Sequence, residues 1–147
     1  MPISNAWGIV TARHSGKIMD IAGGSRDSGA ALQQWQILPN HPNQRFRFEH
    51  LSDGFYLIRV QHTNKVLDVG GASRDSGAAL LQWDWHGGDN QRFALEQAGE
   101  DFYRIRAKHS GKVLDVTRAS RDNGARVIQW DQTGGANQLW KHGVLID

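Results

Sequence analysis

Hydrophobic and polar residues alternate with a period of two in several short stretches, which is typical of half-buried β-strands. In residues 103–108, tyrosine, isoleucine and alanine fall on one face, while arginine and lysine fall on the other. Phe46 and Phe48 alternate with charged residues in the same way. The apolar run at 112–116 indicates a further strand that ends near its aspartate. The pattern therefore predicts an all-β chain of short strands.

Turn residues separate these stretches. Ser-Gly-Lys or Thr-Asn-Lys precedes each apolar run, and Ser-Arg-Asp-(Ser/Asn)-Gly-Ala follows it. Glycine accepts positive φ, and aspartate or serine caps local backbone groups, so both elements predict tight turns. The 17 glycines against three prolines fit many such turns. We expect about four strands per repeating unit, or about twelve in all.

The chain contains three copies of one unit of about 47 residues. A 23-residue core segment begins at His14, His62 and His109; the first two copies agree at 14 positions and the last two at 15. A tail follows each copy, reading NQRF at 43–46, NQRF at 90–93 and NQLW at 137–140. Repeats of this kind identify an architecture built from one supersecondary unit. We place the repeats at approximately 7–50, 55–97 and 102–145.

Three β-rich repeats in 147 residues predict a single domain over residues 1–147. A barrel capped by three hairpins, the β-trefoil with pseudo-threefold symmetry, satisfies this pattern. A propeller has repeats of similar length, but propellers typically need about four to eight blades to close. The predicted fold class is therefore the all-β trefoil.

Composition narrows the function classes. The formal net charge is +2 with the charged residues interspersed, so no cationic face predicts nucleic-acid binding. Cysteine is absent from the sequence, so the fold depends on no disulfide. No apolar run reaches membrane-spanning length, which argues against membrane insertion. The first 17 residues lack the basic start and apolar stretch of a signal peptide. We therefore expect a cytoplasmic location or release by a non-standard route.

The repeated tail resembles the Gln-x-Trp element of the ricin B-type (R-type) lectins, a family that includes family 13 carbohydrate-binding modules. The element reads Gln44-Arg45-Phe46, Gln91-Arg92-Phe93 and Gln138-Leu139-Trp140, so two copies carry Phe where the family has Trp. In the family this aromatic belongs to the core, and Phe should fill the space with some loss of volume. The resemblance covers residues 7 to about 145.

The resemblance implies one shallow sugar site per lobe. The family's site aspartate corresponds to Asp20, Asp68 and Asp115, and its stacking aromatic to Trp35, Trp83 and Trp130. Its site asparagine corresponds to Asn43, Asn90 and Asn137, followed by Gln44, Gln91 and Gln138. Gln33, two residues before the first tryptophan, is implied to reach a sugar hydroxyl, whereas Leu81 and Ile128 stand there in the other lobes. His86 lies before Asn90, where an imidazole could touch a sugar in the second lobe.

Physical chemistry supports these residue types independently. A pyranose has a patch of C–H groups on one face and hydroxyls around its edge, and an indole ring offers a flat apolar surface for that patch. An ionised carboxylate accepts hydrogen bonds from two adjacent hydroxyls. An asparagine amide both donates and accepts. Together these three side chains form a minimal constellation for recognising a hexose.

Structural roles remain open for each of these residues, because core and turn residues also repeat in a threefold fold. The aspartates could cap turns, the tryptophans could pack in the core, and the asparagines could stabilise turns. The three glutamines favour a structural role across the hairpin. His14, His62 and His109 could converge on a metal, but they lack the local spacing of metal ligands. Trp7 and Trp85 are expected to pack against the fold.

The lobes also differ. The first has one extra residue between Trp35 and Asn43 and two prolines there, so we expect Asn43 to be placed differently. Arg26, Arg74 and Arg121 lie in the loop after each site aspartate. They are expected to pair with carboxylates or to face solvent, with contact to an extended or acidic glycan as the alternative. We expect three usable sites of unequal strength.

The predicted function is a lectin with up to three sites, needing no cofactor or metal and catalysing no reaction. No nucleophile elbow, P-loop or zinc-protease motif is present in the sequence. The resemblance implies galactose, N-acetylgalactosamine or lactose as the first choice of glycan, and xylan or another plant polysaccharide as the second. A β-trefoil that binds or inhibits a protein is the rival function. Oligomeric state is left open.

Overall fold

The computed structural model describes residues 5–144, and these form twelve strands joined by turns and short 3-10 segments. The first lobe contains β1 (Gly8–Ala12), β2 (Ile18–Ile21), β3 (Leu32–Trp35) and β4 (Phe46–His50). The second contains β5 (Tyr56–Val60), β6 (Val66–Val69), β7 (Leu80–Trp83) and β8 (Phe93–Gln97). The third contains β9 (Tyr103–Ala107), β10 (Val113–Val116), β11 (Val127–Trp130) and β12 (Trp140–Val144). The predicted β-trefoil is confirmed, while the predicted domain limits at 1 and 147 and the repeat end at 145 lie outside the described residues.

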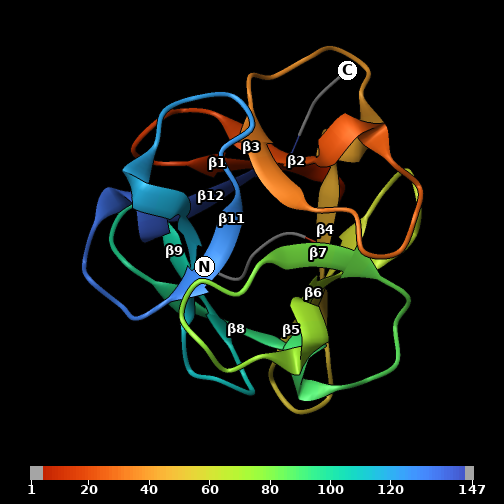
Figure 1. Ribbon diagram of the computed structural model, residues 1–147, viewed down its shortest axis with the longest axis vertical. Helices are drawn as coiled ribbons and strands as arrows, with labels where there is room; N and C mark the ends of the chain where they lie inside the picture. The colour runs from red at the N-terminus through yellow and green to blue at the C-terminus, as the bar shows by residue number, and fades with distance from the viewer. Residues whose placement is uncertain (1–4, 145–147) are drawn as a thin grey trace.

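A closed antiparallel barrel forms from the first and last strand of each lobe. Its pairing runs β1–β4–β5–β8–β9–β12 and returns to β1. Closure leaves the barrel strands without a free edge. The three lobes surround a common centre (Figure 1).

Three hairpins, β2–β3, β6–β7 and β10–β11, cap one end of the barrel. Single bridges between lobes hold the hairpins together: Ala31 pairs with Leu81, Ala79 with Ile128, and Gln33 with Arg126. In Figure 1 the strands β3, β7 and β11 accordingly lie around the centre. Each hairpin is therefore a neighbour of both others.

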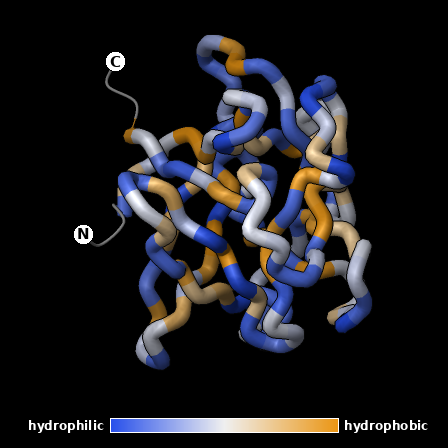
Figure 2. Tube along the Cα trace, turned by 90° about the vertical axis from the view of Figure 1, so that its left-hand side faces the viewer, coloured by the Kyte–Doolittle hydropathy of each residue, from blue (hydrophilic) through white to orange (hydrophobic). Residues whose placement is uncertain are grey.

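The core contains the aromatic of each repeated tail. Phe46 and Phe93 are fully buried and Trp140 is 1% exposed. The indole of Trp140 donates to the Leu114 carbonyl at 3.1 Å, a bond that phenylalanine cannot make. Most of the outer loops are hydrophilic, and the hydrophobic stretches lie mainly inside (Figure 2). The alternation seen in the sequence thus separates the barrel interior from solvent.

Buried glutamines tie each lobe to the next. Gln34, Gln82 and Gln129 are fully buried. Each Nε2 donates at 2.8–2.9 Å to two backbone carbonyls of a neighbouring lobe's loop, those of Ser120 and Asp122, Ser25 and Asp27, and Ser73 and Asp75 respectively. We call this arrangement the loop clamp. It satisfies a buried amide and fixes a surface loop with the same bonds.

The repeated histidines reinforce the loop clamp. The Nε2 atoms of His14, His62 and His109 lie 2.6–2.7 Å from the carbonyl oxygens of Ser120, Ser25 and Ser73. Within residues 5–144 no group of three or more His, Cys, Asp or Glu side chains could hold a metal ion. The same residues include no helix that is long and apolar enough to cross a membrane.

Candidate carbohydrate-binding site

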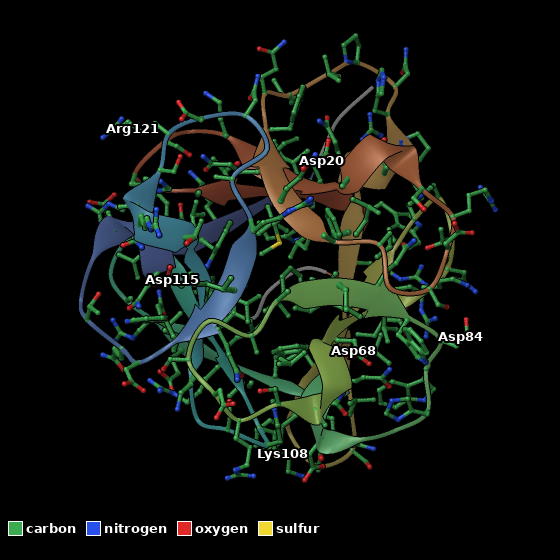
Figure 3. All side chains as sticks on the ribbon, viewed as in Figure 1. Asp20, Asp68, Asp84, Lys108, Asp115 and Arg121 are labelled. Atoms are coloured by element: carbon green, nitrogen blue, oxygen red, sulfur yellow. The ribbon has the colours of Figure 1, made fainter. Side chains whose placement is uncertain are left out.

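The three predicted site aspartates occupy the third position of β2, β6 and β10. Asp20, Asp68 and Asp115 are 4–5% exposed, and each lines a surface hollow in its own lobe. Figure 3 shows these carboxylates in three separate lobes around the centre. We refer to the hollows of Asp20, Asp68 and Asp115 as the first, second and third hollow.

A buried glutamine stands behind each carboxylate. The Nε2 atoms of Gln44, Gln91 and Gln138 donate to Asp Oδ2 at 2.8–2.9 Å and to a backbone carbonyl at 2.8–3.0 Å. Their Oε1 atoms accept a backbone N–H at 2.9 Å. These side chains are 0–1% exposed and line none of the three hollows. They were named with the predicted carbohydrate-binding residues, with a structural role favoured, and their positions suit them to orienting the carboxylate.

Burial raises the pKa of all three aspartates above the ordinary value. Hydrogen bonds from amide groups oppose the rise: Gln44 and Gln33 for Asp20, Gln91 and Asn90 for Asp68, and Gln138 for Asp115. In its buried position each aspartate side chain is therefore more readily protonated than it would be in water. Such groups occur more often at binding sites than in purely structural positions.

The predicted tryptophans end β3, β7 and β11 and line the three hollows. Trp83 is 43% exposed and Trp130 is 41% exposed, and Trp35 is partly exposed. A core role would bury these rings. Their indole surfaces are instead available to a ligand.

Each indole is bordered by a glycine of a neighbouring lobe. A Cβ on Gly124 would lie 3.8 Å from the Trp35 ring, on Gly29 3.7 Å from Trp83, and on Gly77 3.8 Å from Trp130. These glycines have φ between 90° and 96°, which a residue with a side chain rarely adopts. Each indole is therefore flanked by a second lobe, and in the third hollow the flanking glycine, Gly77, is part of the lining.

The asparagines line the three hollows, and they differ in their bonds. Each Nδ2 donates to the backbone carbonyl that follows the site aspartate, at 3.1–3.2 Å for Asn43, Asn90 and Asn137. Asn90 also donates to Asp68 Oδ1 at 3.1 Å. In the first lobe Gln33 makes the corresponding bond to Asp20 Oδ1 at 3.0 Å. Asn90 therefore has one more bond than Asn43 and Asn137, and Gln33 binds the carboxylate while it lines the first hollow.

Residues outside the repeated set distinguish the hollows. His41 lines the first, His86 the second and Thr133 the third. His86 Nε2 lies 3.7 Å from Asp68 Oδ2, so the structure brings these two predicted residues together. The volumes are about 360, 300 and 480 Å³ in the same order.

Sequence reasoning missed His41 and the segments that complete the hollows. Gly23 and Gly24 line the first hollow, Gly71 and Ala72 the second, and Thr117, Arg118 and Ala119 the third. His41 belongs to the loop with the extra residue, where the repeats cannot be matched position by position. Arg118 could have been found, because arginine replaces a glycine of the other two repeats.

A closed six-stranded barrel capped by three hairpins defines the class of β-trefoil proteins, and this one has a hollow in each lobe. The family described as "Ricin-type beta-trefoil lectin domain-like" matches this chain in three overlapping segments, residues 3–83, 42–130 and 89–145. The chain belongs to this family. The family and the fold are those of carbohydrate-binding lectins.

Similar proteins include natural and designed ones. The designed threefold-symmetric protein ThreeFoil is 41% identical, with a TM-score of 0.91 over 95% of this chain and 99% of its own. The exo-β-1,3-galactanase 1,3Gal43A from Clostridium thermocellum is 30% identical with a TM-score of 0.91, over 99% of this chain but only 31% of the galactanase. The clotting factor G alpha subunit of Tachypleus tridentatus is 45% identical over 47 residues, 32% of this chain and 7% of that protein.

Proposed function

We propose that this protein is a multivalent lectin that binds galactose-type glycans in its three hollows and catalyses no reaction. One observation carries the proposal. Each lobe places a buried carboxylate and a partly exposed indole in one open hollow.

The chemistry of this pair suits a hexose. The carboxylate accepts hydrogen bonds from two neighbouring hydroxyls, and such charge-assisted bonds contribute about 1.5–3 kcal/mol each. The indole covers the C–H face of the ring. The asparagine amide, already bonded through Nδ2 to the backbone, presents its oxygen as a further acceptor. A hydroxyl pair beside a flat C–H patch is the chemical feature that these groups would select.

Galactose is the favoured sugar because of the galactanase. That enzyme's name states β-1,3-galactan cleavage, and a module like this chain makes up 31% of it. A module attached to an enzyme commonly recognises the polymer on which the enzyme acts, which is an argument from association rather than from geometry.

Affinity at one hollow should be modest. An open site gives monosaccharide binding free energies of about −4 to −6 kcal/mol, a Kd from millimolar to high micromolar. Three such sites on one rigid barrel raise the apparent affinity for a surface by about 10² or more where the spacing allows simultaneous contact. Attachment to a glycan-coated surface therefore requires no strong single site.

The test is an NMR titration of the ¹⁵N-labelled protein with lactose, following the indole N–H signals of Trp35, Trp83 and Trp130. We expect all three to shift, with different midpoints. The triple variant Asp20→Asn, Asp68→Asn, Asp115→Asn should lose these shifts.

A matched control keeps the same change of charge outside the hollows. Asp27, Asp75 and Asp122 are exposed, occupy equivalent loops and line none of the three hollows. Their triple substitution by asparagine should leave lactose binding intact. Titration of the native protein with xylo-oligosaccharides tests the second class of glycan. Indole signals indifferent to every saccharide would refute the proposal and favour a protein-binding trefoil.

A further inference from the structure

The third hollow is lined by an arginine, whereas the first and second are each lined by a histidine and by no arginine or lysine. Arg118 lines it, at the position occupied by Gly23 in the first lobe and Gly71 in the second. Its lining includes one carboxylate, Asp115, and one guanidinium, Arg118. The difference arises within a segment that otherwise follows the repeat.

The backbone at this position favours glycine. Gly23 and Gly71 have φ of 65° and 64°, and Arg118 keeps the same conformation with φ of 55°. A residue with a Cβ is strained there. Arg118 is exposed, and among residues 5–144 its side chain has no hydrogen-bond or ion-pair partner. Among the described residues no hydrogen bond or ion pair of the Arg118 side chain offsets the strain, and the guanidinium is free to meet a ligand.

A second arginine adds to the charge of the same hairpin. Arg126 replaces Ala31 and Ala79 of the other lobes. The Arg126 carbonyl accepts a hydrogen bond from the N–H of Thr117. This bond continues the pairing of β10 with β11, in which Asp115 lies opposite Ile128. Because side chains alternate along a strand, Arg126 lies on the hairpin face of Asp115 and Ile128. Arg126 also forms the bridge to Gln33, which lines the first hollow, so its charge adjoins both hollows.

The formal charges of the three segments make the contrast clear. Segment 115–128 contains three arginines and two aspartates, so its charge is 3 − 2 = +1. Segments 20–33 and 68–81 each contain one arginine and two aspartates, so theirs is 1 − 2 = −1. The third hollow is also the largest, at about 480 Å³, which leaves space for a substituent beyond one sugar ring.

We propose that the third hollow selects saccharides that carry a carboxylate or a sulfate. This second proposal rests on the proposed function, because the sugar ring would contact Asp115 and Trp130 as it contacts the equivalent residues in the other lobes. The anionic substituent meets the Arg118 guanidinium, which presents paired N–H donors to two oxygens of a carboxylate or sulfate. Arg126 adds attraction that weakens with salt.

The experiment compares lactose with 3′-sialyllactose and with 3′-sulfated lactose, titrated separately into the native ¹⁵N-labelled protein. The Trp130 indole signal should report about three- to tenfold tighter binding of at least one charged sugar in low salt. The Trp83 signal should show no such preference, and any preference at Trp35 should disappear with Arg126→Ala and persist with Arg118→Gly. The two charged probes distinguish carboxylate from sulfate recognition.

Three variants identify the group responsible. Arg118→Gly and Arg126→Ala introduce residues of the other lobes; the first should abolish the preference for charge at Trp130 and the second should reduce it. Lactose binding at Trp83, in the hollow that neither arginine adjoins, should stay unchanged in both. Arg121→Ala is the matched control, since Arg121 is exposed, has counterparts in every lobe and lies at the outer edge of Figure 3.

Each outcome bears on one of the two proposals. Equal binding of neutral and charged sugars at Trp130, with lactose bound at all three sites, would overturn the anionic preference and leave the lectin proposal standing. An equal loss with Arg121→Ala would assign the effect to overall charge and would also overturn it. If no indole signal shifts with any of the sugars, the proposed function itself is refuted.

Discussion

Replacing Asp115 by asparagine tests two effects of its buried charge separately, the free-energy cost to folding and the contribution to sugar binding. Asp115 is 5% exposed and accepts the Gln138 amide at 2.8 Å on Oδ2. Asparagine has the same shape, and its carbonyl oxygen can take the place of Oδ2. Its amide nitrogen then faces the hollow, where it donates instead of accepting.

The substitution should weaken the third site. It removes an ionised acceptor, so about 1.5–3 kcal/mol of a total of about 4–6 kcal/mol is lost. That corresponds to roughly a ten- to hundredfold weaker Kd. NMR titration on the Trp130 indole signal measures this change, while the Trp35 and Trp83 signals in the same spectra act as internal controls.

Stability should not fall at pH 7. Because burial raises the pKa of Asp115 in the folded protein, the ionised form opposes folding above that pKa. The carboxyl's favourable contribution is fully present below the unfolded pKa and is lost as the pH rises through the folded pKa. Asp115→Asn should therefore be at least as stable as the native protein at pH 7, and its relative advantage should shrink on acidification.

Guanidinium chloride unfolding at pH 7 and at about pH 3 supplies the test. A destabilisation above about 2 kcal/mol at pH 7 would mean that the charge supports the fold, and the reasoning would be refuted. Undiminished sugar affinity at Trp130 would refute it equally.

Further predictions concern the indoles, the loop clamp, the core and pH. Trp83→Ala should silence the second site and cost only about 1–1.5 kcal/mol of stability, since the side chain is 43% exposed; lactose titration and chemical unfolding measure the two effects. Gln82→Leu should lower the free energy of unfolding by about 2–4 kcal/mol, because it removes three hydrogen bonds, which denaturant curves will reveal. Trp140→Phe should cost about 1–3 kcal/mol by leaving the Leu114 carbonyl unbonded, although two lobes use Phe natively. Sugar affinity should fall on acidification while the pH is still above the ordinary aspartate range, because the raised pKa values neutralise the carboxylates early; lactose titrations at stepped pH would contradict this if affinity held constant to pH 4.

Local patterns in the sequence predicted most of the fold. Alternation at Phe46 and Phe48 identified a barrel strand, and both side chains are buried in the core. The threefold repeat then specified how often each strand recurs, and the aromatic residues of the Gln-x-Trp element, Phe46, Phe93 and Trp140, fill equivalent core positions. The strand positions and the number of repeats depend on residues close in the chain or on the repeat period, and both can be read from the sequence alone.

Contacts between lobes could not be predicted in the same way. Gln82 and Gln91 recur equally, yet one clamps a neighbouring lobe's loop and the other orients a carboxylate of its own lobe. The glycine beside Trp83 is Gly29, from a different repeat. A period fixes which residues are equivalent, but not which face they occupy or which partner they meet.

The loop clamp also has a direction. The loop of the first lobe is held by the second, that of the second by the third, and that of the third by the first. These contacts form a closed cycle of three lobes. The chain ends break the covalent connection between the first and third lobes, but the clamp between these two lobes remains. One repeat synthesised alone would contain both the clamping glutamine and the clamped loop. The two could not bond to each other, because each glutamine binds the loop of a different lobe. Three such peptides could close the cycle together, so self-assembly of a single repeat into a trimer would recover both the barrel and its hollows.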